Sequence, residues 1–168
     1  MPKIIENLEN RLMEEAKKQI AEVGYSAMTI RSVAKACGVG VGTVYNYFPS
    51  KDDLLAAYML KDWNLCICAI DAVGAYADSP ASVMRCIYDQ LQNFTNAHRL
   101  VFQDAGAGAS FAGSFSRYHG LLRNQLAKPL ARFCGSGFTA EFVAEALLTW
   151  TVAGKPFDEI YDILKKII

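Results

Sequence analysis

Hydroxyl and basic side chains occupy a stretch near the amino terminus that contains no acidic residue. No Asp or Glu occurs between Glu22 and Asp52, and the interval includes Arg31, Lys35 and Lys51. Within it, residues 29–51 combine cations with hydroxyl groups. Such groups bind phosphate oxygens, and the lack of carboxylates removes the repulsion that would oppose binding. This pattern indicates contact with the backbone of a nucleic acid.

Cysteines and histidines are the other candidates for chemistry, and the chain has Cys37, Cys66, Cys68, Cys86, Cys134, His98 and His119. Cys66 and Cys68 would point about 200° apart on a helix, so they would not bind one ion together. We interpret the two histidines as capping or surface groups, and the glycines around residue 106 do not form a dinucleotide fingerprint. With no cysteine–histidine pair in a recognisable setting, an enzyme is the weaker alternative. We therefore expect no catalytic residues, no metal and no cofactor.

Length and composition narrow the classes of protein further. The 168 residues suffice for one compact domain or two small ones, and a content of 52% hydrophobic and 20% charged residues excludes disorder. The formal net charge is zero, yet residues 1–51 carry 7 basic and 5 acidic groups. The first residues lack a signal-peptide pattern, and the longest apolar region, residues 63–77, is too short to span a bilayer. We expect a cytoplasmic protein with reduced cysteines and no membrane partner.

Helical periodicity supplies the elements that must position these residues. The pattern predicts helices at about residues 5–23, 30–37, 40–48, 50–73, 80–97, 99–105, 116–134, 139–153 and 157–168. Gly24 is expected to end the first helix, and Thr29 and Ser50 to cap the second and fourth. Residues 106–114, rich in Gly, Ala and Ser, fall outside these helices. No alternating β-branched run appears, so the predicted fold class is all-α.

Two short helices joined by a tight glycine turn, packed on a longer first helix, form the plan of a helix-turn-helix. The run from Thr29 to Leu54, with Gly24-Tyr25 before it, resembles the DNA-binding signature of the tetracycline-repressor (TetR) family. The residues in register are Gly24-Tyr25, Thr29, Ala34, Gly38-Val39, Gly42-Thr43, Tyr45, Phe48, Lys51 and Leu54. The resemblance covers about a third of the chain. Gly40 departs from it where a serine N-cap is common, and Ile20 where an aromatic is common.

The resemblance implies DNA contacts for Thr29, Arg31, Val41, Gly42, Thr43, Tyr45, Asn46, Tyr47 and Lys51. Hydroxyl and ammonium groups suit phosphate oxygens, whereas Arg31 can read guanine, Asn46 adenine, and Val41 a thymine methyl. Gly42 permits close approach of the backbone, and Thr43 offers both a methyl and a hydroxyl group. The alternatives are a solvent-facing charge for Arg31 and core packing for Tyr45. Phe48 we interpret as a core residue that pairs with Val44.

Few cations are available per chain, which favours a homodimer on a palindromic operator. A monomer that neutralises three phosphates would have a salt slope of only about −3, and two-fold symmetry doubles the contacts. We expect the last two helices to form the dimer surface through two apolar stripes. The stripes are Val143, Ala146, Leu147, Trp150 and Phe157, Ile160, Tyr161, Leu164. The alternative is that both stripes pack only on their own chain.

The resemblance divides the chain into a helix-turn-helix domain at residues 1–50 and a helical effector-binding and dimerisation domain at residues 51–168. Candidates for the wall of a ligand pocket are Tyr58, Trp63, Cys66, Tyr88, Phe94, Phe102, Phe111, Phe115, Tyr118 and Trp150. By resemblance, the chain is a repressor that a small apolar effector releases, with the fourth helix coupling pocket to recognition helix. The alternative is a regulator without an effector, whose second half only dimerises. An enclosed cavity would favour the ligand-gated form.

Overall fold

The computed structural model describes residues 7–168, apart from the side chains of residues 106 and 108–118. Every regular element in the described part is helical, so the all-α prediction is confirmed. The chain divides into two compact units. The first comprises the residues up to Lys61 together with His98–Ala112, and the second comprises Asp62–Ala97 and Gly113–Ile168.

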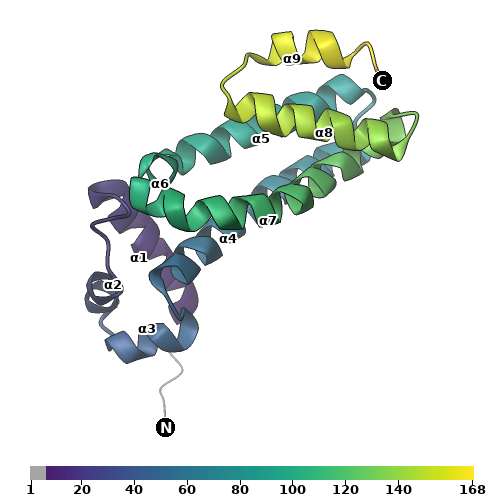
Figure 1. The fold of residues 1–168 in the computed structure, drawn as a ribbon. Helices are drawn as coiled ribbons and strands as arrows, with labels where there is room; N and C mark the ends of the chain where they lie inside the picture. Colours follow the sequence, from purple (N-terminus) through teal and green to yellow (C-terminus); the bar gives the residue numbers. More distant parts are fainter. Residues whose placement is uncertain (1–6) are drawn as a thin grey trace. The chain divides into compact units, whose positions relative to one another are not determined.

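The first unit is a small helical cluster built on α1. Its elements are α1 (Leu8–Val23), α2 (Ile30–Cys37), α3 (Val41–Tyr47), the start of α4 (Lys51–Tyr76), α6 (Arg99–Gln103) and the start of α7 (Ala105–Leu130). α1 packs on α2 and on α6, and α2 packs on α3 (Figure 1). Leu12, Ala16, Val33, Val44 and Leu54 are buried in its core, which fixes the two short helices by apolar contact.

Local capping chemistry sets the ends of these helices as the sequence predicts. Gly24 ends α1 with a φ of +84°, a value that side chains rarely adopt. Thr29 Oγ1 accepts the Ser32 N–H at 3.0 Å, and the Thr29 N–H donates to Ser32 Oγ at 3.1 Å, which forms a capping box. Ser50 Oγ accepts the Asp53 N–H at 3.1 Å. The predicted end at Gly24 and the two predicted caps are confirmed.

The second unit has an apolar core of its own. Its elements are the rest of α4 and of α7, α5 (Pro80–Ala97), the 3-10 turn η1 (Ala131–Phe133), α8 (Gly137–Val152) and α9 (Phe157–Leu164). α5 packs on α8 and α9, and α8 also packs on α9 and η1. The predicted helix at 116–134 instead runs from Ala105 to Leu130 and includes the Gly/Ala/Ser-rich segment. Asp104 starts it, because its carboxylate accepts the Ala107 N–H at 3.2 Å.

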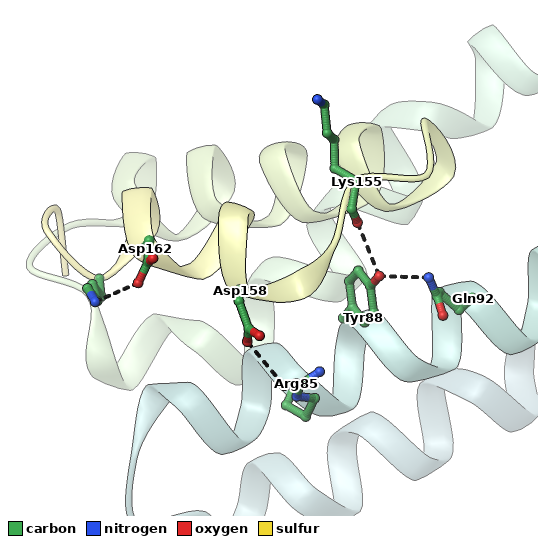
Figure 2. Close-up of polar contacts among 7 residues, drawn as sticks. Arg85, Tyr88, Gln92, Lys155, Asp158 and Asp162 are labelled. Atoms are coloured by element: carbon green, nitrogen blue, oxygen red, sulfur yellow. Dashed lines mark hydrogen bonds and ion pairs between the residues drawn. The ribbon is translucent and has the colours of Figure 1, made fainter.

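Polar contacts tie α9 and the loop before it to α5 (Figure 2). Tyr88 Oη donates to the carbonyl oxygen of Lys155 at 3.1 Å and accepts from Gln92 Nε2 at 2.7 Å. Arg85 lies 3.4 Å from Asp158 Oδ1, and its guanidinium stands over the Phe157 ring at 3.8 Å. These contacts hold the apolar face of α9 against its own chain.

Within residues 7–168, none of the helices has the length and apolar character that a bilayer crossing requires.

Candidate DNA-binding surface

A groove of about 520 Å³ runs along the helix-turn-helix. Its walls are Ser26, Met28, Thr29, Ile30, Arg31, Val41, Tyr45, Pro49, Ser50 and Lys51. The structure therefore places five of the nine predicted DNA-contacting residues along one groove, from the start of α2 across α3 to the start of α4. Two of the lining residues are cations and none is an acid, so the groove favours an anion.

The face of α3 that is turned away from the core carries the other predicted contacts. Val44 and Phe48 are buried, as predicted, and they dock the helix on the unit. Tyr45 is 49% exposed and Tyr47 is 41% exposed, so the alternative that Tyr45 is a core residue is wrong. Gly42 and Asn46 are also exposed, and a Cβ added at Gly42 would meet no atom within 4 Å. The exposed side of α3 can therefore approach a flat partner closely.

The start of α2 presents Thr29 and Arg31 to the groove. Both are exposed. The Thr29 oxygen already accepts a backbone N–H in the capping box, so towards a phosphate it keeps only its hydroxyl hydrogen. Exposure of Arg31 suits a base contact and a solvent-facing charge equally well, and both alternatives stay open.

The ammonium group of Lys51 lies over an aromatic ring at the start of α4. Its Nζ is 4.0 Å from the centroid of Tyr25, whose hydroxyl donates to the Asp52 carboxylate. Burial lowers the pKa of Lys51, and the negative charges of Asp104 and Asp52 act in the opposite direction. Burial, with the hydrogen bond and charge of Asp52, raises the pKa of Tyr25 well above its ordinary value. Tyr25 therefore stays a neutral donor that positions both α4 residues.

Asp104 is the residue of this surface that sequence reasoning misses. Its carboxylate binds Ser26, which lines the groove, although the two residues lie 78 positions apart. No acidic residue lies between Glu22 and Asp52 in the sequence, but the fold places the carboxylate of Asp104 beside Ser26 at the edge of the groove. No local pattern signals a contact of this range.

The predicted ligand-pocket residues whose side chains the structure describes belong to both units. Tyr58 lies beside His98 in the first unit, with ring centroids 5.4 Å apart and ring planes tilted by 33°, and Phe102 there is exposed. In the second unit Trp63 packs edge-on against Phe94 at 5.5 Å.

The remaining candidates for the pocket have different surroundings. Trp63 Nε1 donates to Gln125 Oε1 at 2.8 Å. Cys66, three residues after Trp63 on α4, is also buried. Tyr88 packs on Phe157, and Trp150 is exposed. Phe111, Phe115 and Tyr118 lie outside the described side chains. A second groove, of about 360 Å³, is lined by none of these candidates; its walls are Asp71, Gly74, Ala75, Lys128, Pro129 and Arg132.

The predicted dimer stripes need correction. The side chains that pack into the core of their own chain are Val143, Leu147, Phe157, Ile160 and Leu164. Ala146 and Tyr161 are half-buried against that core, and only Trp150 is exposed. α5 covers these faces, so they offer little area to a partner. The apolar side chains that α8 and α9 do expose include Phe138 (75%), Phe142 (51%), Val152 and Ile163, and Ile167 is exposed after the end of α9.

The histidine and cysteine side chains do not assemble a reactive centre in the described part of the chain. His98 is buried at the start of α6. Its backbone carbonyl accepts N–H groups of that helix, but its side chain makes no capping hydrogen bond. The prediction of a capping or surface side chain is therefore wrong for His98. His119 Nε2 lies 2.8 Å from Glu145 Oε1. Burial raises the pKa of the Cys37 and Cys66 thiols, which disfavours the reactive thiolate. Among the described residues, no three His, Cys, Asp or Glu side chains are grouped to hold a metal ion.

Comparison with known proteins gives matches in sequence and in structure. Residues 12–58 match the family described as bacterial regulatory proteins, tetR family. An HTH-type transcriptional regulator of Staphylococcus aureus (strain MRSA252) is 30% identical over 98 residues, which are 58% of this chain and 53% of that protein. The chain spans between about a quarter and just over half of the length of the first curated relatives it matches.

Two solved structures cover nearly the whole chain. A TetR-family transcriptional regulator of Streptomyces coelicolor superposes with a TM-score of 0.68 at 15% identity, over 95% of this chain and 99% of that one. Thermus thermophilus FadR, a TetR-family repressor in complex with lauroyl-CoA, superposes with a TM-score of 0.64 at 18% identity, over 94% and 91% of the two chains. At these identities the likeness is one of fold.

Proposed function

We propose that the chain, whose residues 12–58 match the tetR family of bacterial regulatory proteins, is a DNA-binding transcriptional regulator and not an enzyme. The observation that carries the proposal is the groove beside α3, whose lining holds Arg31 and Lys51 and no acid. A groove of this charge attracts the phosphate backbone, while the exposed side of α3 is free to meet base edges.

In this proposal α3 enters the major groove of the DNA. Gly42, Thr43 and Asn46 face the bases, because Val44 and Phe48 turn the opposite side of the helix into the core. Tyr45 and Lys51 bind phosphate oxygens from the groove that α3 shares with α2 and α4. Phosphate contacts of this kind fix the register of the protein on the duplex, and the α3 side chains then select the sequence.

We propose a homodimer on a palindromic operator. Two cations per groove are too few for tight binding by one chain, and a symmetric pair doubles them. Phe138 and Phe142, one turn apart on α8 with ring centroids 6.4 Å from each other, support a partner surface on that helix. Trp150 continues the exposed apolar row and is the residue of the original stripes that such a surface retains. Aromatic side chains of this kind are enriched at protein interfaces.

For regulation we propose release from the operator by a small apolar ligand bound in residues 51–168. The lauroyl-CoA complex of the FadR neighbour supports this class of effector. α4 begins at Lys51 in the DNA-binding groove and continues to Trp63 in the apolar core of the second unit, so one helix carries both ends of the coupling. Release requires that the ligand discriminate the two states by a few kcal/mol.

A regulator without an effector is the second candidate. The tight packing of Trp63 and Tyr88 in the core of the second unit favours it, because these two predicted pocket residues are only 5% and 7% exposed. Titration of the bound operator complex with fatty acyl thioesters separates the two candidates. Dissociation supports ligand gating, and retention of the complex under every apolar ligand supports the second candidate.

Selection of bound duplexes from a random pool tests the proposed function itself. The selected motif should be an inverted repeat with half-sites about 34 Å apart, which matches one turn of B-DNA. Arg31→Ala should cost about 1–3 kcal/mol at one base position if Arg31 reads guanine, and should weaken all duplexes equally if it does not. A monomeric protein without preference for any duplex at low ionic strength would refute the proposal.

A further inference from the structure

The turn between α1 and α2 is held by a carboxylate from a distant part of the chain. The Ser26 N–H donates to Asp104 Oδ2 at 3.0 Å, and Ser26 Oγ donates to Asp104 Oδ1 at 2.7 Å. A Cβ added at Gly24 would lie 4.0 Å from Asp104 Oδ2, so the same oxygen also borders the residue that ends α1. Gly24 has a φ of +84°, and because it has no side chain, nothing of its own restrains the backbone there. Asp104 is therefore the group that fixes this turn.

The same carboxylate begins α7. Asp104 Oδ1 accepts the Ala107 N–H at 3.2 Å, and the Asp104 N–H donates to the Val101 carbonyl at 3.2 Å and closes α6. Three donors from two elements thus share one carboxylate, which leaves it a single orientation. A shift of the first turn of α7 would have to move Ser26 or break its bonds.

Asp104 also acts on Lys51, one of the two cations that line the groove. Its charge opposes the effect of burial on the pKa of Lys51 and so helps to keep that ammonium group protonated. A carboxylate at the edge of a surface that binds phosphates nevertheless repels them. By charge alone, Asp104 would weaken DNA binding.

We propose that Asp104 is a positioning residue for the DNA-binding groove, which holds Ser26 and the approach to α2 in the geometry that DNA requires. The inference rests on the proposed function. Ser26 lines the groove and stands three residues before Thr29, the N-cap of α2. Through Asp104, the shape of the groove depends on the first turn of α7. This makes the junction of α6 and α7 a point from which operator affinity is controlled.

The test compares Asp104→Ala, Asp104→Asn and Ser26→Ala with the exposed control Asp78→Ala, each as the full chain. Affinity for the selected operator duplex is measured at several salt concentrations. Positioning predicts that Asp104→Ala weakens binding about tenfold, a loss of the order of one hydrogen bond to a charged group. The slope of log K against log[salt] should not change, because no phosphate contact is removed. Asp104→Asn, which keeps one acceptor oxygen, should lose less.

The two possible roles of Asp104, its charge and its positioning of Ser26, predict opposite changes in DNA affinity. If Asp104 acts only through its charge, both Asp104→Ala and Asp104→Asn bind DNA more tightly than the wild type. The double variant Ser26→Ala/Asp104→Ala should bind no more weakly than Asp104→Ala alone, because both substitutions remove the same contact. Amide hydrogen exchange at Ser26 should accelerate in Asp104→Ala and stay unchanged in Asp78→Ala.

Several results would overturn the inference. They are wild-type or tighter affinity in Asp104→Ala, an equal loss in Asp78→Ala, or losses at Ser26 and Asp104 that simply add. If Asp104→Ala does not fold, the test uses Ser26→Ala. That variant removes the hydrogen bond from Ser26 Oγ to Asp104 and keeps the one from the backbone N–H. If the wild type itself selects no duplex, the proposed function fails. If the wild type binds and Asp104→Ala binds equally well, only the role of Asp104 fails.

Discussion

Gly74 of α4 lies directly against Pro129 of α7 in the second unit, and its replacement by alanine should destabilise the protein. A Cβ at this position would stand 2.6 Å from Cβ of Pro129 and 3.5 Å from its Cα. The first distance is shorter than real Cβ contacts allow, and the obstacle is a rigid ring attached to backbone. Overpacking of this kind costs about 1–3 kcal/mol. Alanine regains about 1 kcal/mol of helix propensity, so the net loss should be about 0–2 kcal/mol.

Gly120→Ala is the matched control. Gly120 also lies within a helix, α7, but a Cβ there meets no atom within 4 Å. It should stabilise the protein by about 0.5–1 kcal/mol, since only the propensity term acts. Urea denaturation followed by circular dichroism measures both free energies of unfolding, and thermal melting should show shifts of opposite sign, about 2–4 °C per kcal/mol. Stabilisation by Gly74→Ala would refute the close approach of Pro129.

Three further predictions concern DNA binding, pH and assembly. Lys51→Ala should weaken binding to all duplexes alike and should reduce the salt slope by about one per chain, measured by fluorescence anisotropy at several salt concentrations. Burial raises the pKa of Glu145, but hydrogen bonds and charges, chiefly those of His119, outweigh burial and lower it. The stability that Glu145 contributes is therefore present above its unfolded pKa and is lost as the pH falls through its lowered folded pKa; Glu145→Gln should flatten the acid limb of a stability–pH curve, and an unchanged limb would contradict this. Phe142→Ser should shift sedimentation toward monomer, whereas Val23→Ser, equally exposed on α1, should not; equal behaviour of the two would argue against a dimer surface on α8.

The sequence predictions that succeeded depended on interactions between residues close together in the chain. Thr29 and Gly38 act through their own backbone neighbours, so the N-cap at Thr29 and the glycine turn at Gly38, which has a φ of +70°, follow from residue type and spacing; the reciprocal bond from Ser32 was not predicted. Val44 and Phe48 are four residues apart and share one side of a helix, which predicted their burial. These features decide the helix-turn-helix without reference to the rest of the chain.

Predictions that depended on what covers a surface were the ones that failed. The stripe that includes Val143 and Leu147 is apolar at helical spacing, but periodicity does not say whether the covering side chains come from the same chain or from a partner. Here α5 covers it. The informative residues were Phe138 and Phe142, which share a side of α8 that the chain leaves open. Asp104 was missed for a related reason, since a contact over 78 residues leaves no local signature.

The composition of the first unit has a consequence for synthesis of the protein. Because His98–Ala112 belongs to it, the unit cannot close while only the first 61 residues have left the ribosome. Val101 and Asp104 are added some 40 residues later, after α5 has been made. At an elongation rate of about 5–20 residues per second, that interval lasts roughly 2–8 seconds. During this time the nascent chain holds α1, α2 and α3 without the residue that binds the turn at Ser26, so the proposed DNA-binding groove can reach its final geometry only after Asp104 has been translated.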